Sequence, residues 1–315
     1  MRAWHSGAMT RIALLTTGGT IACTTDESGA LRPTVSGTEL LDAVRDHLAV
    51  PADVTVRELT RLDSSAISLA ELDGLIAAVH SALEDPSIDA VVVTHGTDSM
   101  EDTAFALDCF HSDDRPVILT GAQRAFDHRE SDGPGNLIDA LRLAADPLAR
   151  RQGVLIAFGG WTIPARGAVK RHTTDLDAFI STVPREVRRP ASVPVAPLSG
   201  VSVPVLASWP GADRSLVDAA LHAGARGLVI EALGSGNIGP EMGAGVAEAL
   251  ESGVPVVITT RVPSGPVGLA YGGGGGGATL GSLGAVSAGH LRAGQARMAL
   301  VVALATGNDV SDLLV

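Results

Sequence analysis

Apolar and polar stretches alternate along the chain, and their spacing predicts strands that are followed by helices. Short apolar runs between polar turns are typical of buried strands, whereas apolar residues three or four positions apart are typical of helices. In the first half of the chain, the predicted strands cover residues 12–15, 54–59, 90–93, 116–120 and 153–158. The predicted helices cover residues 38–48, 69–83 and 135–145, with another around 104–110. This alternation predicts a doubly wound, mainly parallel sheet.

A change in composition predicts a boundary between two domains. Residues 184–204 (PREVRRPASVPVAPLSGVSVP) are rich in proline, as linkers often are. Beyond them, predicted strands at 205–206, 228–230 and 256–258 alternate with helices at 214–223 and 240–251. The predicted fold class is therefore α/β, with a larger N-terminal doubly wound domain and a smaller C-terminal α/β domain. We expect a disordered extension at 1–9, the N-terminal domain at 10–185, a linker at 186–204 and the C-terminal domain at 205–315.

Two segments without periodicity are predicted to be loops. Residues 23–37 (CTTDESGALRPTVSG) are polar and rich in turn-forming residues, which indicates a mobile loop and a candidate lid. The glycine run at 272–277 follows no predicted strand and has no phosphate-binding lysine. We interpret this run as a flexible loop rather than a nucleotide site.

Composition narrows the class of partner. With 45% apolar and 18% charged residues, the chain is typical of a soluble globular protein. The formal charge of −12 and the lack of a basic run argue against a nucleic-acid or anionic-membrane partner. No apolar run approaches the roughly 18 residues that span a bilayer, and residues 1–9 contain no secretory signal. The only two cysteines, Cys23 and Cys109, fit a reducing cytoplasm.

Polar residues follow four predicted strands. They are Thr20 after Gly18-Gly19, the pair Ser64 and Ser65, the pair Thr97 and Asp98, and, after a longer interval, Lys170. Because the carboxyl ends of parallel strands meet at one edge of a sheet, we expect these residues to converge. Hydroxyl groups beside a carboxylate and an amine are the groups that a nucleophilic hydrolase needs.

Each of these residues also has a structural interpretation. Taken alone, Thr20 is more simply explained as a residue that satisfies the backbone of its turn. Ser99 and Asp102 have the spacing of a helix-capping box, and Lys170 lies between arginines, as a solvated lysine often does. The alternatives are separated only by whether the residues converge.

Metal and thiol chemistry are weaker alternatives. The nine histidines have neither HxH nor HExxH spacing, so we predict no metal site and no cofactor. His95 is expected to orient its turn. Cys23 lies three residues after Thr20 but has no histidine near it in sequence, and Cys109 is expected in the core.

With these clusters identified, the chain resembles the bacterial type I/II L-asparaginase family over nearly its whole length. The two specific matches are TTGGTIA at 16–22 and VVVTHGTDSMEDTA at 91–104. Weaker matches are GAQR with SDGPGNL at 121–137, and GAVKRHTTDLDAF at 167–179. Four ordered matches at compatible spacing make a chance resemblance improbable.

The resemblance implies roles for individual residues. Thr20 would be the acylated nucleophile, and Thr97, Asp98 and Lys170 would form the second catalytic group beside it. Ser64 would bind the α-carboxylate of the substrate, and Asp98 would also hold its α-ammonium. The other residues implied in substrate binding are Ser65, Gly19, Gly96, Ala122 and Asn237.

The resemblance also implies a homotetramer built from close dimers, in which the C-terminal domain of a neighbouring subunit completes each active site. The location predicted from the composition is the cytoplasm. Three departures from the family pattern stand against a full match. The loop at 23–37 lacks the usual tyrosine, so that Thr34 could substitute for it or turnover could be weak. Ser235 replaces a common asparagine, and the glutamate that many periplasmic members supply across the interface has no counterpart in YGGGGGGATL at 271–280. Tyr271, the chain's one tyrosine, is expected either to pack beside the glycine run or to reach a neighbouring site in place of that glutamate.

The predicted function is hydrolysis of L-asparagine to L-aspartate and ammonia, without metal or cofactor, by an amidohydrolase that acts on a small amino-acid amide. One alternative is a catalytically weak homologue that binds an amino acid as a regulatory protein. Another is the asparaginase-like subunit of a tRNA-dependent amidotransferase, for which an additional N-terminal domain and a partner subunit are expected. The preference for asparagine, glutamine or D-amides stays open.

Overall fold

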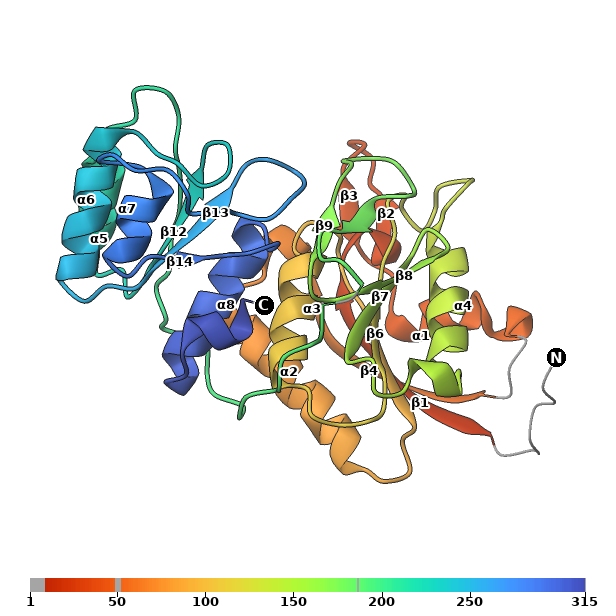
Figure 1. Ribbon diagram of the computed structural model, residues 1–315. Helices are drawn as coiled ribbons and strands as arrows, with labels where there is room; N and C mark the ends of the chain where they lie inside the picture. Colours follow the sequence, from red (N-terminus) through yellow and green to blue (C-terminus); the bar gives the residue numbers. More distant parts are fainter. Residues whose placement is uncertain (1–8, 49–51, 186, 315) are drawn as a thin grey trace. The chain divides into compact units, whose positions relative to one another are not determined.

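The structure, a computed structural model, describes residues 9–48, 52–185 and 187–314. The chain forms two compact units (Figure 1). The first comprises Met1–Ala104, Ser112–Ala165 and Lys170–Ile180, and the second comprises Phe105–His111, Arg166–Val169 and Ser181–Val315. The expected extension lies outside the described residues except for Met9, and the expected domain boundaries stay a prediction.

A six-stranded sheet forms the centre of the first unit, in the order β4-β1-β5-β6-β7-β8. Its strands are β1 (Thr10–Gly18), β4 (Ala52–Leu62), β5 (Ala90–Thr94), β6 (Val117–Thr120), β7 (Val154–Phe158) and β8 (Trp161–Pro164). Neighbouring strands from β4 to β7 are parallel, and β8 is antiparallel to β7. In chain order, β1 is followed in this sheet by β4, which pairs with one side of β1, and then by β5, which pairs with the other side. The direction in which strands are added to the sheet therefore reverses beside β1. Ligands of open α/β sheets bind at such a reversal, outside the carboxyl ends of the strands.

Helices cover both faces of this sheet, as doubly wound folds require. Apolar residues of β1 such as Ile12 and Leu14 pack with α1 (Gly37–Asp42) and α4 (Gly133–Ala144) in one core cluster. The helix α2 (Leu69–Glu84) lies on the opposite face (Figure 1). Capping boxes begin α1 and α2, with Ser36 and Ser68 as the capping residues. The larger, mainly parallel domain predicted from the sequence is confirmed.

Two local predictions for the segment after Thr20 are wrong. Residues 23–37 contain an antiparallel hairpin formed by β2 (Cys23–Thr25) and β3 (Leu31–Pro33), rather than a segment without regular structure. The carboxylate of Asp127 accepts a hydrogen bond from the Thr25 N–H at 2.8 Å, which ties the hairpin to the loop after β6. The helix predicted at 38–48 ends at Asp42, and a 3₁₀ turn at Arg45–His47 follows it. Val44 is fully buried between them, so the apolar pattern is kept without a continuous helix.

The second unit contains a smaller parallel sheet. Its strands, in the order β11-β12-β13-β14, are β11 (Val205–Ala207), β12 (Leu228–Ala232), β13 (Val256–Thr260) and β14 (Val286–Ser287). The helices are α5 (Ser215–His222), α6 (Pro240–Glu251), α7 (Gly277–Ser282) and α8 (Ala293–Thr306). Met242 of α6, Val217 of α5 and Leu280 of α7 share a core cluster with β12 and β13. The predicted smaller α/β domain is confirmed, although α7, α8 and β14 had no predicted counterpart.

Among the residues that the structure describes, no helix is both long enough and apolar enough to cross a membrane.

Candidate active site

The turn after β1 presents Thr20, and two glycines determine its shape. Gly18 and Gly19 have φ angles of 104° and 77°, in a region of backbone conformation that residues other than glycine rarely adopt. A Cβ atom on Gly19 would lie 2.4 Å from the Gly96 backbone, so the turn after β1 packs directly on the turn after β5. Thr20 and Thr97 each follow one of the two glycines that touch. This contact brings the first two predicted hydroxyl groups to the same region of the first unit.

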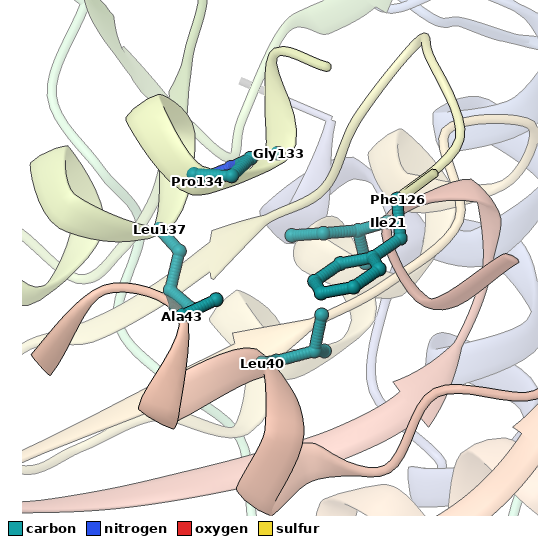
Figure 2. Close-up of a pocket in the computed structure, with 7 residues that line it drawn as sticks. All are labelled: Ile21, Leu40, Ala43, Phe126, Gly133, Pro134 and Leu137. Atoms are coloured by element: carbon teal, nitrogen blue, oxygen red, sulfur yellow. The ribbon is translucent and has the colours of Figure 1, made fainter. Parts of the chain in front are cut away.

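A small apolar pocket lies beside the turn and holds the side chain of Ile21. Figure 2 shows Ile21 and Phe126 directed into a space that Leu40, Ala43 and Leu137 also line. Ile21 is 1% exposed, whereas its neighbour Thr20 is partly exposed. The short 3₁₀ turn Thr20–Ala22 therefore buries Ile21 and leaves the threonine on the accessible side.

The turn after β4 supplies the third element of the site. Ser64 is 4% exposed, and its Oγ accepts a hydrogen bond from the Asp98 N–H at 3.0 Å. A Cβ on Gly96 would lie 2.6 Å from this oxygen, so only glycine leaves room for it. Ser99 immediately precedes α3 (Met100–Phe110), as a capping residue does, but its hydroxyl donates to the Ser64 carbonyl at 2.7 Å. The turns after β1, β4 and β5 therefore form one packed group.

Lys170 joins this group through two hydrogen bonds. Its Nζ donates to Thr97 Oγ1 at 2.7 Å and to Asp98 Oδ1 at 3.1 Å. The side chain of Lys170 is 19% exposed, whereas that of Asp98 is 62% exposed. We call Thr97, Lys170 and Asp98 the triad. The ammonium is thus mostly buried but neutralised by a carboxylate that remains accessible to a ligand.

The prediction that Lys170 follows a strand of the main parallel sheet is wrong. Lys170 does not follow a strand of the main sheet but ends β9 (Ala168–Lys170), which pairs only with β10 (Phe179–Ser181) in a separate two-stranded ladder. Its backbone is held instead by Glu101, whose Oε2 accepts a hydrogen bond from the Lys170 N–H. Burial and the nearby Asp102 raise the pKa of Glu101 to about 7.

Two residues that contact the triad were not among the predicted site residues. Gln123 accepts a hydrogen bond from Thr97 Oγ1 at 3.3 Å, and Glu101 holds the Lys170 backbone. Gln123 follows the carboxyl end of β6, so the strand-end rule that selected Thr20 and Thr97 points to Gln123 as well. Glu101 lies in the first turn of α3 and carries no such signal.

The remaining predicted substrate-binding residues differ in their surroundings. Ser65 is exposed and Ala122 is fully buried. The Gly19 N–H donates to the Leu62 carbonyl, so this group shapes the turn. Asn237 belongs to the second unit, where its Oδ1 accepts a hydrogen bond from the Gly277 N–H at 3.3 Å, at the start of α7. A role for Asn237 in binding substrate stays a prediction.

The alternatives to a hydroxyl nucleophile lose support. Cys23 is buried, and this burial raises the pKa of its thiol to about 11, which disfavours the reactive thiolate. Burial lowers the pKa of His95 to about 4, and its Nδ1 lies 2.7 Å from the Gly96 carbonyl, so the neutral ring donates to the turn as expected. Thr34, the suggested substitute for a loop tyrosine, has its hydroxyl 2.7 Å from that of Thr24. Within the described part of the chain, no three His, Cys, Asp or Glu residues are grouped to hold a metal ion.

The first unit is thus a doubly wound α/β unit whose strand-end turns bring hydroxyl groups and a carboxylate together, and the amine of Lys170 joins them from the end of β9. This arrangement defines the class of nucleophilic hydrolases as candidates.

Comparison with known proteins identifies the family. The family described as "Asparaginase, N-terminal" matches residues 11–191, and "Glutaminase/Asparaginase C-terminal domain" matches residues 202–313. The chain is 36% identical over 327 aligned residues to the Probable L-asparaginase of Deinococcus radiodurans, which covers 97% of this chain and 96% of that protein. The chain belongs to the asparaginase family and is an amidohydrolase of that family.

Two further relatives bear on the details of the function. The crystal structure of the probable cytoplasmic L-asparaginase from Campylobacter jejuni has a TM-score of 0.83 at 29% identity and covers 97% of this chain and 98% of that one. A Glutamyl-tRNA(Gln) amidotransferase subunit of Methanopyrus kandleri is 31% identical over 289 residues, or 82% of this chain and 63% of that protein.

Proposed function

We propose that this chain hydrolyses L-asparagine to L-aspartate and ammonia through an acyl-enzyme formed on Thr20. One observation carries the proposal. The triad, with Lys170 Nζ at 2.7 Å from Thr97 Oγ1 and 3.1 Å from Asp98 Oδ1, lies beside Gly96, and Gly96 packs on the glycine that precedes Thr20. Relatives named L-asparaginase support the choice of substrate.

Two chemical steps follow from this arrangement. Thr20 Oγ attacks the side-chain carboxamide carbon, a C–O bond forms and the C–N bond breaks, and the proton of Thr20 leaves with the nitrogen as ammonia. Water then cleaves the β-aspartyl ester and restores the Thr20 hydroxyl. We assign Thr97 Oγ1 as the hydrogen-bond acceptor for the Thr20 hydroxyl, and the ammonium of Lys170 stabilises negative charge that develops on oxygen. Neither step uses a metal or cofactor.

The α-carboxylate and the α-ammonium of the substrate can each bind to a side chain of the site. Ser64 Oγ accepts from the Asp98 N–H, so its own proton is left to donate to the α-carboxylate. Asp98, with its side chain 62% exposed, can hold the α-ammonium. We assign supporting contacts to Ser65, Gly19, Gly96 and Ala122, and a contact across subunits to Asn237 in a cytoplasmic homotetramer.

The test uses ammonia release from L-asparagine by purified variants. Thr20→Ala should abolish turnover, and both Lys170→Met and Lys170→Arg should do so because neither supplies a compact amine. Thr38→Ala and Arg142→Met, which change exposed residues of α1 and α4, are the matched controls. Light scattering should show a tetramer for every variant. Substantial turnover by both Thr20→Ala and Lys170→Met would reject the proposal.

The acyl-enzyme can be tested separately from turnover. Hydroxylamine attacks an ester faster than water does, so the wild-type protein should form aspartyl β-hydroxamate from L-asparagine. Rapid acid quenching and mass spectrometry should find the aspartyl group on the peptide that contains Thr20. Turnover without hydroxamate and without labelled peptide would instead indicate direct attack by water.

A second candidate function is glutamine hydrolysis as part of a tRNA-dependent amidotransferase, which the match to the amidotransferase protein of Methanopyrus kandleri favours. A substrate panel of L-Asn, D-Asn, L-Gln and β-aspartyl amides separates the candidates. A preference for L-Gln supports the second function. Aspartate binding by calorimetry without turnover of any amide would support the regulatory alternative.

A further inference from the structure

The side chain of Gln123 connects Thr97 to the loop that follows Lys170. Its Oε1 lies 3.3 Å from Thr97 Oγ1, and its Nε2 lies 3.1 Å from the Asp175 carbonyl and 3.5 Å from the His172 carbonyl. Because carbonyl oxygens can only accept hydrogen bonds, the end of the amide that faces Asp175 and His172 must be the NH₂ group. The other end, which faces Thr97, is therefore an acceptor.

This assignment fixes the proton of the Thr97 hydroxyl. The ammonium group of Lys170 has only hydrogen-bond donors, so Thr97 Oγ1 must accept from it. The single proton of Thr97 then points to Gln123 Oε1. Each group of this chain therefore donates a hydrogen bond to the next: Lys170 to Thr97, Thr97 to Gln123, and Gln123 to the Asp175 carbonyl. Thr97 Oγ1 keeps one lone pair that is used by neither Lys170 nor Gln123.

The backbone of Gln123 is also held firmly. The carboxylate of Asp132 accepts hydrogen bonds from the Gln123 N–H, at 3.0 and 3.1 Å to its two oxygens, and from the Arg124 N–H at 2.9 Å. Asn136 donates to Asp132 Oδ2 and to the Gly121 carbonyl. A half-buried side chain that is fixed at both ends loses little freedom when substrate binds, which is what a preorganised site requires.

We propose that Gln123 is a positioning residue that holds the Thr97 proton away from the reaction, so that the free lone pair of Thr97 accepts a hydrogen bond from the Thr20 hydroxyl and later from the hydrolytic water. The inference rests on the proposed function of Thr20. Without Gln123, the Thr97 hydroxyl can rotate and present its proton to the nucleophile. The chemical step then slows while substrate binding persists.

The first test is Gln123→Met, which keeps the length of the side chain but removes its donors and its acceptor. We expect kcat for L-asparagine to fall about 10- to 100-fold and KM to change less than about threefold, since an orienting hydrogen bond acts on the chemical step. Gln152→Met, at an exposed glutamine, is the matched control. In a Thr97→Ala background, Gln123→Met should reduce the residual rate no further, because Gln123 acts through Thr97.

The second test is Gln123→Glu, which also covers the case that the methionine variant fails to fold. A protonated glutamic acid can donate to the Asp175 carbonyl and accept from Thr97, as glutamine does, whereas the carboxylate cannot donate. The charged or titratable groups around this position are Lys170, Asp98, Asp132, His172 and Asp175. The ratio of kcat for Gln123→Glu to that of the wild type should therefore rise as pH falls through the carboxyl pKa. A role in packing alone would give a ratio that does not change with pH.

The outcomes separate the two proposals. Wild-type turnover that Thr20→Ala abolishes, together with an unchanged kcat in Gln123→Met, overturns the inference and leaves the proposed function standing. A change in KM alone, or a ratio for Gln123→Glu that is independent of pH, also overturns the inference. A wild-type chain that releases no ammonia from any amide of the panel overturns both.

Discussion

At the scale of single residues, Glu101 is a buried carboxyl group whose ionisation opposes folding. Its pKa of about 7 lies above the ordinary value of 4.5 because burial and Asp102 disfavour the charge, and the hydrogen bond from the Lys170 N–H only partly offsets this. The folded state therefore binds the proton more tightly than the unfolded state does. The free energy of unfolding that Glu101 contributes is highest below about pH 4.5 and falls as pH rises to about 7.

The variant Glu101→Gln tests this dependence, because an amide oxygen still accepts from the Lys170 N–H but carries no charge. Relative to the wild type, the variant should gain stability between pH 5 and pH 8, by at most about 3 kcal/mol. Urea unfolding at both pH values measures the difference. A difference in stability that is the same at the two pH values would contradict a raised pKa.

Lys170 shows how far single residues could be predicted from sequence. Its charge suggested a solvated lysine, yet among the 23 Lys and Arg residues of the chain it is the only lysine. All the other residues of this group are arginines, and a compact ammonium makes different hydrogen bonds from a planar guanidinium, so the choice of lysine here is a signal that charge alone does not give. Gln123, by contrast, was visible only as part of a strand-end turn, and its contact with Thr97 depends on a loop 49 residues or more away in sequence.

At the scale of secondary-structure elements, backbone contact between glycines determines where the turn after β1 lies against the turn after β5. Gly19 combines a φ of 77° with a position at which a Cβ would lie 2.4 Å from Gly96. Sequence reasoning found the glycine pair, the strand and the turn, because glycine after an apolar run is a local signal. The packing of Gly19 on Gly96 and of Gly96 on Ser64 is not local, and no property of the three turns taken separately predicts it.

Gly19→Ala should therefore separate contact from conformational strain. The matched control is Gly29→Ala in the hairpin, which has a φ of 85° but nothing within 4 Å of an added Cβ. Both variants should lose about 1 kcal/mol of stability from the positive φ, but only Gly19→Ala should displace Thr20 and reduce ammonia release by more than about 100-fold. Equal losses of activity in the two variants would show that the contact with Gly96 has no role in placing the nucleophile.

At the scale of the whole molecule, the alternation of strands and helices in the two main sheets followed largely from the sequence, whereas α7, α8, β14 and the long-range connections did not. The predicted linker at 186–204 is one example. Its Arg189 donates to the Asp108 carboxylate at 2.6 Å and to the Asp108 and His111 carbonyls, and Asp108 is only 3% exposed. The composition of this segment shows that it is proline-rich and basic. Composition does not indicate which buried carboxylate an arginine of the segment contacts. The segment is tied to α3 within the second unit.

This ion pair predicts a large effect from a residue outside the candidate site. Arg189→Met should lower the free energy of unfolding by about 2–3 kcal/mol, because it removes a charge partner from a buried carboxylate. The loss should be smaller than that of an isolated buried pair, since Arg166 Nε remains 4.0 Å from Asp108 Oδ2.

The neighbouring exposed arginine provides the control, and Arg188→Met should change stability by less than about 0.5 kcal/mol. In the double variant Asp108→Asn/Arg189→Met, part of the loss should be recovered, because the buried carboxylate that Arg189 neutralised is then absent, although Arg166 also loses its contact with that charge. Urea unfolding of the wild type and of four variants, Asp108→Asn alone among them, measures these differences. A double variant as unstable as the sum of Asp108→Asn and Arg189→Met would show that the two side chains act independently.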